Sequence, residues 1–403
     1  MVKSIDLVPK KTGYLEVYPF KENEYVLHQN QLGYHINVNQ DTVKLLDLVD
    51  NSRTVQEITQ IYSEKEGISI EPETVYDLLF QKLAKYGIIE SHLVNPEKKQ
   101  VASYLKLSFT LIKDSYITFF TRILKPIIPV KRFYMILFAF LGISFGTLIY
   151  NYKILLISLD SLSPSSWGLL FLLAGGFLFL HEFGHATTCA KFGATHGHIG
   201  FGFYLFTPVM YADVSDIWRL DKYKRVLVNL SGIYMDSLMA ALLSGAFWIT
   251  GNGIFLIIAG MLVLNTFKNL NPFLRYDGYW VLSDMTEISN LRHKSNQLLG
   301  AFVRHLFSRK PFIFSKTNLF LVSYAFISIF FILIVLTIFV LKDPNHFLRF
   351  PIVLVTYLQA ILTGQKTFVF SDLYGFVLPA LLYYLVGKLV VSAFLRWFRK
   401  RPR

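Results

Sequence analysis

Residues 175–193 read GGFLFLHEFGHATTCAKFG, so an apolar stretch runs directly into two histidines and a glutamate. Apolar runs of about 20 residues, long enough to cross a hydrocarbon core of about 30 Å, recur along the chain. The 403 residues are 53% hydrophobic with a mean hydropathy of +0.43, which is too apolar for an ordinary soluble protein. Ionisable side chains at membrane depth cost at least a few kcal/mol each and indicate a functional site.

Charge divides the chain into two parts. Residues 1–100 hold 11 Lys and Arg against 15 Asp and Glu and contain no long apolar run, whereas the remainder holds 29 basic and 12 acidic residues. The basic excess lies between and after the apolar runs, which is typical of membrane orientation and argues against nucleic-acid binding. No cleavable signal peptide is visible, so we expect an acidic cytoplasmic N-terminal domain and a basic membrane domain.

The first hundred residues predict a small α+β domain with a winged-helix-like order of elements. Its acidic balance disfavours DNA binding. Thr54 and Glu57 have the spacing of a helix capping box, and Gly87 is a helix stop before a closing strand. The predicted strands are 14–19, 24–29 and 33–38, and the predicted helices begin at residues 41, 54 and 72.

Residues 13–92 resemble the PqqD-like precursor-recognition domains of enzymes that mature ribosomally made peptides. The hairpin, the stretch LLDLVDNSRTVQEI and the ending LLFQKLAKYGIIE carry this resemblance. It implies that a leader peptide adds as a strand along residues 34–38, beside the helix around 74–86. The alternative is a small domain that only packs on its neighbour.

The rest of the chain predicts a mostly α, polytopic membrane protein with about six spans. Residues 350–364 are short for a span and are expected to be re-entrant, and the aromatic, basic segment within 95–132 is expected to lie along the interface. Basic residues concentrate in the loops 191–225 and 275–317, which places both loops and the N-terminus in the cytoplasm of a multi-pass cell-membrane protein. The predicted spans are 133–151, 167–190, 226–249, 253–273, 318–341 and 371–395.

His181 and His185 lie four residues apart, so both can reach one metal ion from the same helix face. Glu182 then stands beside the metal, which is the H-E-x-x-H spacing of zinc peptidases with glutamate as general base. The sole cysteine, Cys189, excludes a disulfide within the chain and a thiolate cluster, so His and carboxylate ligands must hold any Zn²⁺. An interhelical hydrogen-bonded cluster is the alternative.

A catalytic zinc needs a third protein ligand and an open position for water. Asp277 is nominated because it follows the fourth predicted span, which runs in the same direction as the second and is broken at Pro272. Asp236 lies too deep in the third span, and Asp284 and Glu287 lie further into the loop.

HEFGH together with Asn269, Pro272, Asp277 and Gly278 in N-x-x-P-x-x-x-x-D-G spacing resembles the site-2-protease family of intramembrane zinc metalloproteases. The resemblance covers about residues 130–290. It implies zinc on His181, His185 and Asp277, Glu182 as general base, and Asn269 as a residue that helps to hold the substrate or the tetrahedral intermediate. Tyr276 stands where the family commonly has Leu, which puts the shape of the pocket in doubt.

Other residues near the HEFGH motif are not expected to bind the metal. Residues 197–216 are expected to form either a hairpin facing the active-site cavity, able to pair with an extended substrate, or a plain interfacial loop. His196 and His198 are interpreted as polar loop residues rather than ligands. Polar or small side chains on one side of the third span are expected to pack against the catalytic spans: Asn229, Gly232 and Asp236.

These observations predict four regions: a recognition domain (1–94), a linker and interfacial segment (95–132), a zinc protease core (133–290), and a loop with C-terminal membrane helices (291–403). The predicted function is an intramembrane zinc endopeptidase that cleaves a ribosomally made precursor, for instance of a bacteriocin, during maturation or export, with an associated peptide exporter as a further partner. One alternative is cleavage of a membrane-anchored regulatory protein such as an anti-sigma factor. Another is a non-proteolytic zinc-binding protein of immunity or transport.

Overall fold

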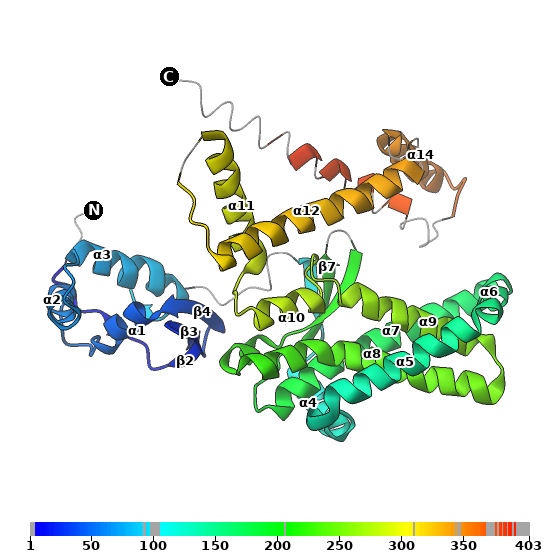
Figure 1. Ribbon diagram of the computed structural model, residues 1–403, viewed down its shortest axis with the longest axis horizontal. Helices are drawn as coiled ribbons and strands as arrows, with labels where there is room; N and C mark the ends of the chain where they lie inside the picture. The colour runs from blue at the N-terminus through cyan, green and yellow to red at the C-terminus, as the bar shows by residue number, and fades with distance from the viewer. Residues whose placement is uncertain are drawn as a thin grey trace. The chain divides into compact units, whose positions relative to one another are not determined.

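A computed structural model gives the fold of the chain (Figure 1). It divides into two compact units, which are described separately: the first comprises Met1–Ser103, Ser108–Phe201 and Met210–Ser289, and the second comprises Tyr104–Leu107, Gly202–Val209 and Asn290–Arg403. The structure describes residues 5–91, 94–96, 105–204, 207–308, 311–342, 344, 348–367, 375–376, 379–380, 382–384, 386–388 and 391. The predicted span 371–395 lies largely outside these residues.

The N-terminal domain has a three-stranded antiparallel sheet in the order β2-β3-β4. Its strands are β2 (Leu15–Lys21), β3 (Glu24–Gln29) and β4 (Tyr34–Asn39), each within two residues of its predicted bounds. A second small sheet pairs β1 (Lys10–Lys11) with β5 (Ile89–Glu90), the predicted closing strand.

Helices cover this sheet through a continuous apolar core. The capping box of Thr54 and Glu57 is formed at the start of the second helix, and Gly87, with a φ of 69°, ends the last helical turn as predicted. Leu27, Ile58 and Leu79 are fully buried in the core. The helices are α1 (Gln40–Asp47), α2 (Val55–Glu66) and α3 (Pro72–Tyr76), which continues as a π-helical turn η1 (Asp77–Leu83) and a 3₁₀ turn η2 (Ala84–Tyr86).

The segment expected to lie along the interface contains a strand that the sequence did not predict. β6 (Lys106–Ile112) forms a sheet in the order β6-β7-β8 with β7 (Ile199–Tyr204) and β8 (Thr207–Ala212). Residues 197–216 therefore contain a hairpin, one of the two expected forms. After β6 come α4 (Asp114–Leu124) and two 3₁₀ turns, η3 (Lys125–Ile127) and η4 (Val130–Arg132).

A helical bundle positions the candidate site. Its centre is α8, which packs against α5, α7, α9 and α10 and is buried along most of its length. Glycine allows α7 and α8 to approach closely, because a Cβ at Gly184 would lie 2.5 Å from the carbonyl oxygen of Ser231. The elements are α5 (Phe133–Tyr150), α6 (Tyr152–Asp160), α7 (Pro164–Lys191), η5 (Ser215–Arg219), α8 (Lys222–Thr250), α9 (Gly253–Asn269) and α10 (Asp277–Met285).

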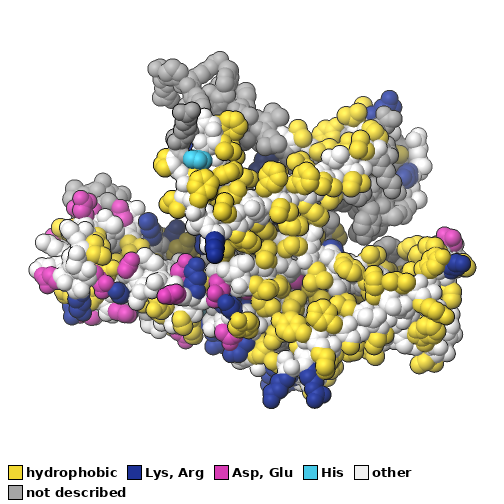
Figure 2. Space-filling view, in the orientation of Figure 1, with side chains coloured by type: hydrophobic (Ala, Val, Ile, Leu, Met, Phe, Trp, Pro, Cys, Tyr) yellow, Lys and Arg dark blue, Asp and Glu magenta, His cyan; other side chains and the backbone are white. Residues whose placement is uncertain are grey.

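Four helices among the described residues are long and apolar enough to cross a membrane. They are Val130–Tyr150, Ser166–Lys191, Lys222–Thr250 and Lys316–Val335. The six spans predicted from sequence are thus not all found: the fourth, 253–273, is a helix that ends at Asn269 after 17 residues, because the Asn271-Pro272 break follows it. Figure 2 shows hydrophobic side chains over the face of α5 and α6 in view, while acidic side chains gather on the N-terminal domain.

The second unit is mainly helical in its described part. α11 (Leu291–Ser308) packs against α12 (Lys316–Lys342), which matches the predicted span 318–341. α14 (Phe350–Leu362) has only 13 residues, so it is short for a span as expected for 350–364.

Candidate metal centre

Two imidazoles from α7 meet at the face of α8. His181 and His185 lie one turn apart on α7, and their Nε2 atoms are 3.2 Å apart. Both side chains are buried, with 4% and 6% of their surface exposed. The predicted pairing of the two histidines on one helix face is therefore present.

The third predicted ligand, Asp277, joins them from the first residue of α10. Its Oδ2 lies 3.0 Å from His181 Nε2 and its Oδ1 lies 3.4 Å from His185 Nε2. The chain reaches this position because α9 ends at Asn269 and the Asn271 side chain accepts hydrogen bonds from the next backbone N–H groups. Gly278 packs so closely against the Leu270 carbonyl that any side chain there would clash.

The outer nitrogen of each imidazole has a partner on α8. His185 Nδ1 lies 2.8 Å from the carbonyl oxygen of Val228, which can only accept, so this nitrogen carries the proton. His181 Nδ1 donates to Asp236 Oδ2 at 2.9 Å, and Asn265 donates to the same oxygen at 2.8 Å. Both Nε2 atoms are thereby left with lone pairs that point toward Asp277.

Gly232 provides room in front of the two imidazoles. A Cβ atom at this position would clash with Nε2 of both His181 and His185. The space is therefore kept free of side-chain atoms at the point toward which the donor atoms converge.

The donor set fits a zinc ion. Ligand atoms 2.0–2.2 Å from a tetrahedral metal lie about 3.3–3.6 Å apart. The two Nε2 atoms here are 3.2 Å apart, and the two oxygens of Asp277 lie 3.0 Å from His181 Nε2 and 3.4 Å from His185 Nε2. Asp277 supplies a carboxylate oxygen beside the two imidazole nitrogens, and a carboxylate is a ligand that zinc accepts together with imidazole. Two imidazoles and one carboxylate leave a fourth position for water or substrate.

Glu182 is buried beside this centre. It directly follows His181, 7% of its surface is exposed, and the backbone of Ala212, the last residue of β8, lies close to its carboxylate. The end of the hairpin therefore lies against the predicted general base.

Asn269 also lies at the centre, since its Nδ2 is 3.5 Å from His181 Nε2 and its side chain is buried. The two histidines that follow α7 in the chain do not join this centre. His196 contacts Thr118, and His198 contacts the hydroxyl of Tyr211 at 3.2 Å. This agrees with their interpretation as polar loop residues.

Asp236 contacts the candidate centre directly, which the sequence did not predict. It was expected only to pack against the catalytic spans, yet it accepts the hydrogen bond that orients His181. The sequence did hold a sign of this role: a carboxylate inside a predicted span is energetically costly, so Asp236 was expected to need a partner. The sequence could not identify His181 as that partner, because the contact depends on how α7 and α8 cross.

Comparison with known proteins finds a relative of similar sequence. Over 224 residues the chain is 28% identical to the "Putative peptide zinc metalloprotease protein YydH" of Bacillus subtilis (strain 168), an alignment that covers 53% of this chain and 86% of the relative. No family model matches the chain. No solved structure matches it either.

Proposed function

We propose that the chain is an intramembrane zinc endopeptidase whose ligands are His181, His185 and Asp277. The observation that carries this proposal is the convergence of these three side chains within 3.0–3.4 Å of one another, beside Glu182. The similarity to a protein named as a peptide zinc metalloprotease supports the same reaction.

Each residue then has a definite task. When bound, zinc would polarise the scissile carbonyl and lower the pKa of a water molecule. Glu182 accepts the proton of that water as it attacks the carbonyl carbon, and returns it to the leaving amine. Asp236 and the Val228 carbonyl hold the two imidazoles in the orientation that ligation requires. Asn269 is positioned to hold the substrate near the metal.

The reaction is proposed to take place within the membrane, near its cytoplasmic side. His181 and His185 lie in the C-terminal half of α7, which contains a candidate span and leads into the basic loop starting at Lys191. The substrate must arrive as an extended strand, because a helix keeps its carbonyls in its own hydrogen bonds. The β7–β8 hairpin, whose last residue contacts Glu182, supplies backbone with which such a strand could pair.

The proposed substrate is a ribosomally made precursor peptide presented by the N-terminal domain. β4 is an edge strand of the three-stranded sheet. Tyr34, at the start of β4, packs on Tyr86 at the end of the last helical turn, with the two ring centres 5.2 Å apart. An extended leader adding to this edge would gain backbone hydrogen bonds. A peptide exporter that removes the product is the proposed partner.

Cells that make either the wild-type chain or Glu182→Gln test the proposal. Mass spectrometry of their small peptides should show a shortened peptide only with the wild-type chain, and its uncut precursor should copurify with the variant. Copurification of a membrane-anchored regulatory protein would instead favour the anti-sigma type of substrate. Identical peptide and protein fragments in both cultures would contradict proteolysis.

A further inference from the structure

A second group of metal-binding side chains lies on the N-terminal sheet, far along the chain from the HEFGH motif. The register of the sheet places His28 of β3 directly opposite His35 of β4, and Glu16 of β2 opposite His28. Residues that face each other across antiparallel strands project from the same side of a sheet. Three strands therefore present a row of one carboxylate and two imidazoles, and the imidazoles stack with their ring centres 4.1 Å apart.

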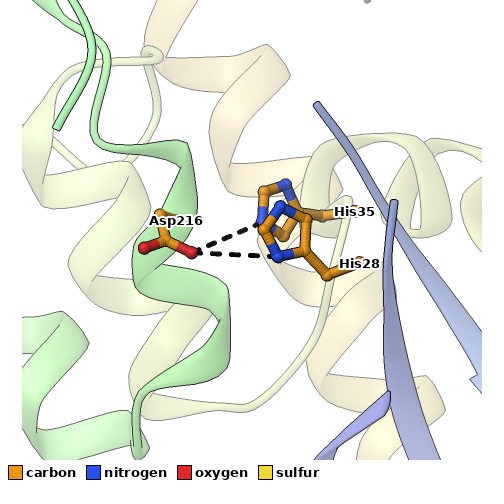
Figure 3. Close-up of side chains that lie close together, drawn as sticks. All are labelled: His28, His35 and Asp216. Carbon is orange, nitrogen blue, oxygen red and sulfur yellow. Dashed lines mark ion pairs between the residues drawn. The ribbon is translucent and has the colours of Figure 1, made fainter. Parts of the chain in front are cut away.

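A fourth side chain faces this row from outside the sheet. Asp216 of η5 directs Oδ1 at His28 Nδ1 and His35 Nε2, each 4.0 Å away (Figure 3). Its other oxygen, Oδ2, is held by the backbone N–H and hydroxyl of Thr195, at 2.6 and 2.8 Å. The carboxylate is thus fixed with one oxygen free toward the imidazoles.

These distances are too long for direct hydrogen bonds between the groups. Among the described residues His28 Nδ1 makes no hydrogen bond, although it lies 3.6 Å from Glu16 Oε2 and only 14% of the side chain is exposed. The side chains of His35 and Asp216 are 7% and 9% exposed. One nitrogen of each imidazole therefore lies near Asp216 Oδ1, at a distance that leaves room for an ion or a water molecule between them.

We propose that His28, His35 and Asp216 bind a second Zn²⁺ ion, with Glu16 or a water molecule as the fourth ligand. Two imidazole nitrogens and carboxylate oxygen form a donor set that suits zinc and disfavours magnesium and calcium. All three ligand atoms lie within 4.8 Å of one another. Reaching the separation of about 3.3 Å found around tetrahedral zinc requires these atoms to approach one another by up to about 1.5 Å, with rotation of the stacked imidazoles.

Such an ion would join the N-terminal domain to the segment that leads into α8. The same two surfaces already touch beside the site, where Phe20 of β2 packs on Trp218 of η5 at 5.7 Å and Arg225 lies over the Phe20 ring at 4.7 Å. η5 ends three residues before α8, the helix that holds the imidazoles of the first centre. The second ion is therefore structural, and the inference does not depend on the proposed proteolysis.

Zinc content of the full chain, purified in detergent and dialysed, tests the inference by elemental mass spectrometry. Wild-type protein should hold two zinc ions per chain. His181→Ala/His185→Ala should hold one, because this variant leaves His28, His35 and Asp216 unchanged. His28→Gln/His35→Gln should also hold one, and the matched control His196→Gln, which alters a loop histidine outside both centres, should hold two.

Cobalt gives a readout that is independent of stoichiometry. In the His181→Ala/His185→Ala background, Co²⁺ should produce visible absorption bands of a nitrogen and oxygen site, and the further change Asp216→Asn should abolish or shift them. Glu16→Gln should weaken cobalt binding by about tenfold if this carboxylate is the fourth ligand, and leave it unchanged if water is. Zinc content that is the same in His28→Gln/His35→Gln as in the wild-type chain, or no cobalt bands in the His181→Ala/His185→Ala background, would overturn the proposal.

Discussion

At the scale of residues, the candidate metal centre depends as much on the partners of its histidines as on the histidines themselves. Asp236 and the Val228 carbonyl bind the outer nitrogens of His181 and His185, which fixes the tautomer of each ring. Sequence spacing was sufficient to predict that His181 and His185 share one helix face, since four residues make about one helical turn. It could not reveal the partners, which come from another helix.

Asp236→Asn should weaken zinc binding by about 10–100-fold while the chain still folds. The amide can still accept from His181 Nδ1, but the negative charge that strengthens this ligand is lost. Competition for zinc with a chromophoric chelator measures the effect. Ser244→Ala is the matched control, because Ser244 is buried in the same helix and bonds only within it. Equal affinity in the Asp236 variant and the control would contradict this role.

At the scale of elements, local patterns predicted much of the fold. The strands β2 to β4, the capping box at Thr54 and the break after α9 all follow from neighbouring residues, and all are present. β6 was missed although its sequence KLSFTLI alternates polar and apolar residues, because the aromatic, basic segment around it was interpreted as lying along the interface. The cluster of His28, His35 and Asp216 was missed because strand register and packing onto η5 create it.

Gly232→Ala should abolish zinc binding at the first centre, because the added methyl group would meet both imidazoles where α7 and α8 cross. Gly245→Ala in the same helix should leave zinc binding unchanged, since a Cβ there meets no atom within 4 Å. Zinc content and the melting temperature of both variants check the prediction. Normal zinc content in the Gly232 variant would show that the metal lies elsewhere.

At the scale of the whole molecule, composition separates an acidic N-terminal part from an apolar, basic part. The N-terminal 100 residues are acidic, and the candidate spans begin only at Val130. The excess of Lys and Arg in the loops around residues 191–225 and 275–317 predicts that these loops and the N-terminal domain share the cytoplasmic side. The loops predicted on the other side of the membrane, 152–166 and 250–252, contain a single basic residue, Lys153.

Single cysteines introduced into a Cys189→Ala background test this orientation. In intact cells a membrane-impermeant maleimide should label Ser161→Cys, which is exposed just after α6 in a loop predicted to lie outside. It should label Lys65→Cys, exposed at the end of α2, only after the cells are opened. The reverse pattern would contradict the predicted orientation.

The central claim is that Glu182 acts as the base of a zinc peptidase. Its most direct test is cleavage of the captured precursor peptide by purified, zinc-loaded chain, compared with Glu182→Gln of equal zinc content. Loss of a general acid–base should slow peptide cleavage by about 10²–10⁴-fold while zinc stays bound. Equal cleavage rates for the two proteins at equal zinc content would contradict the account.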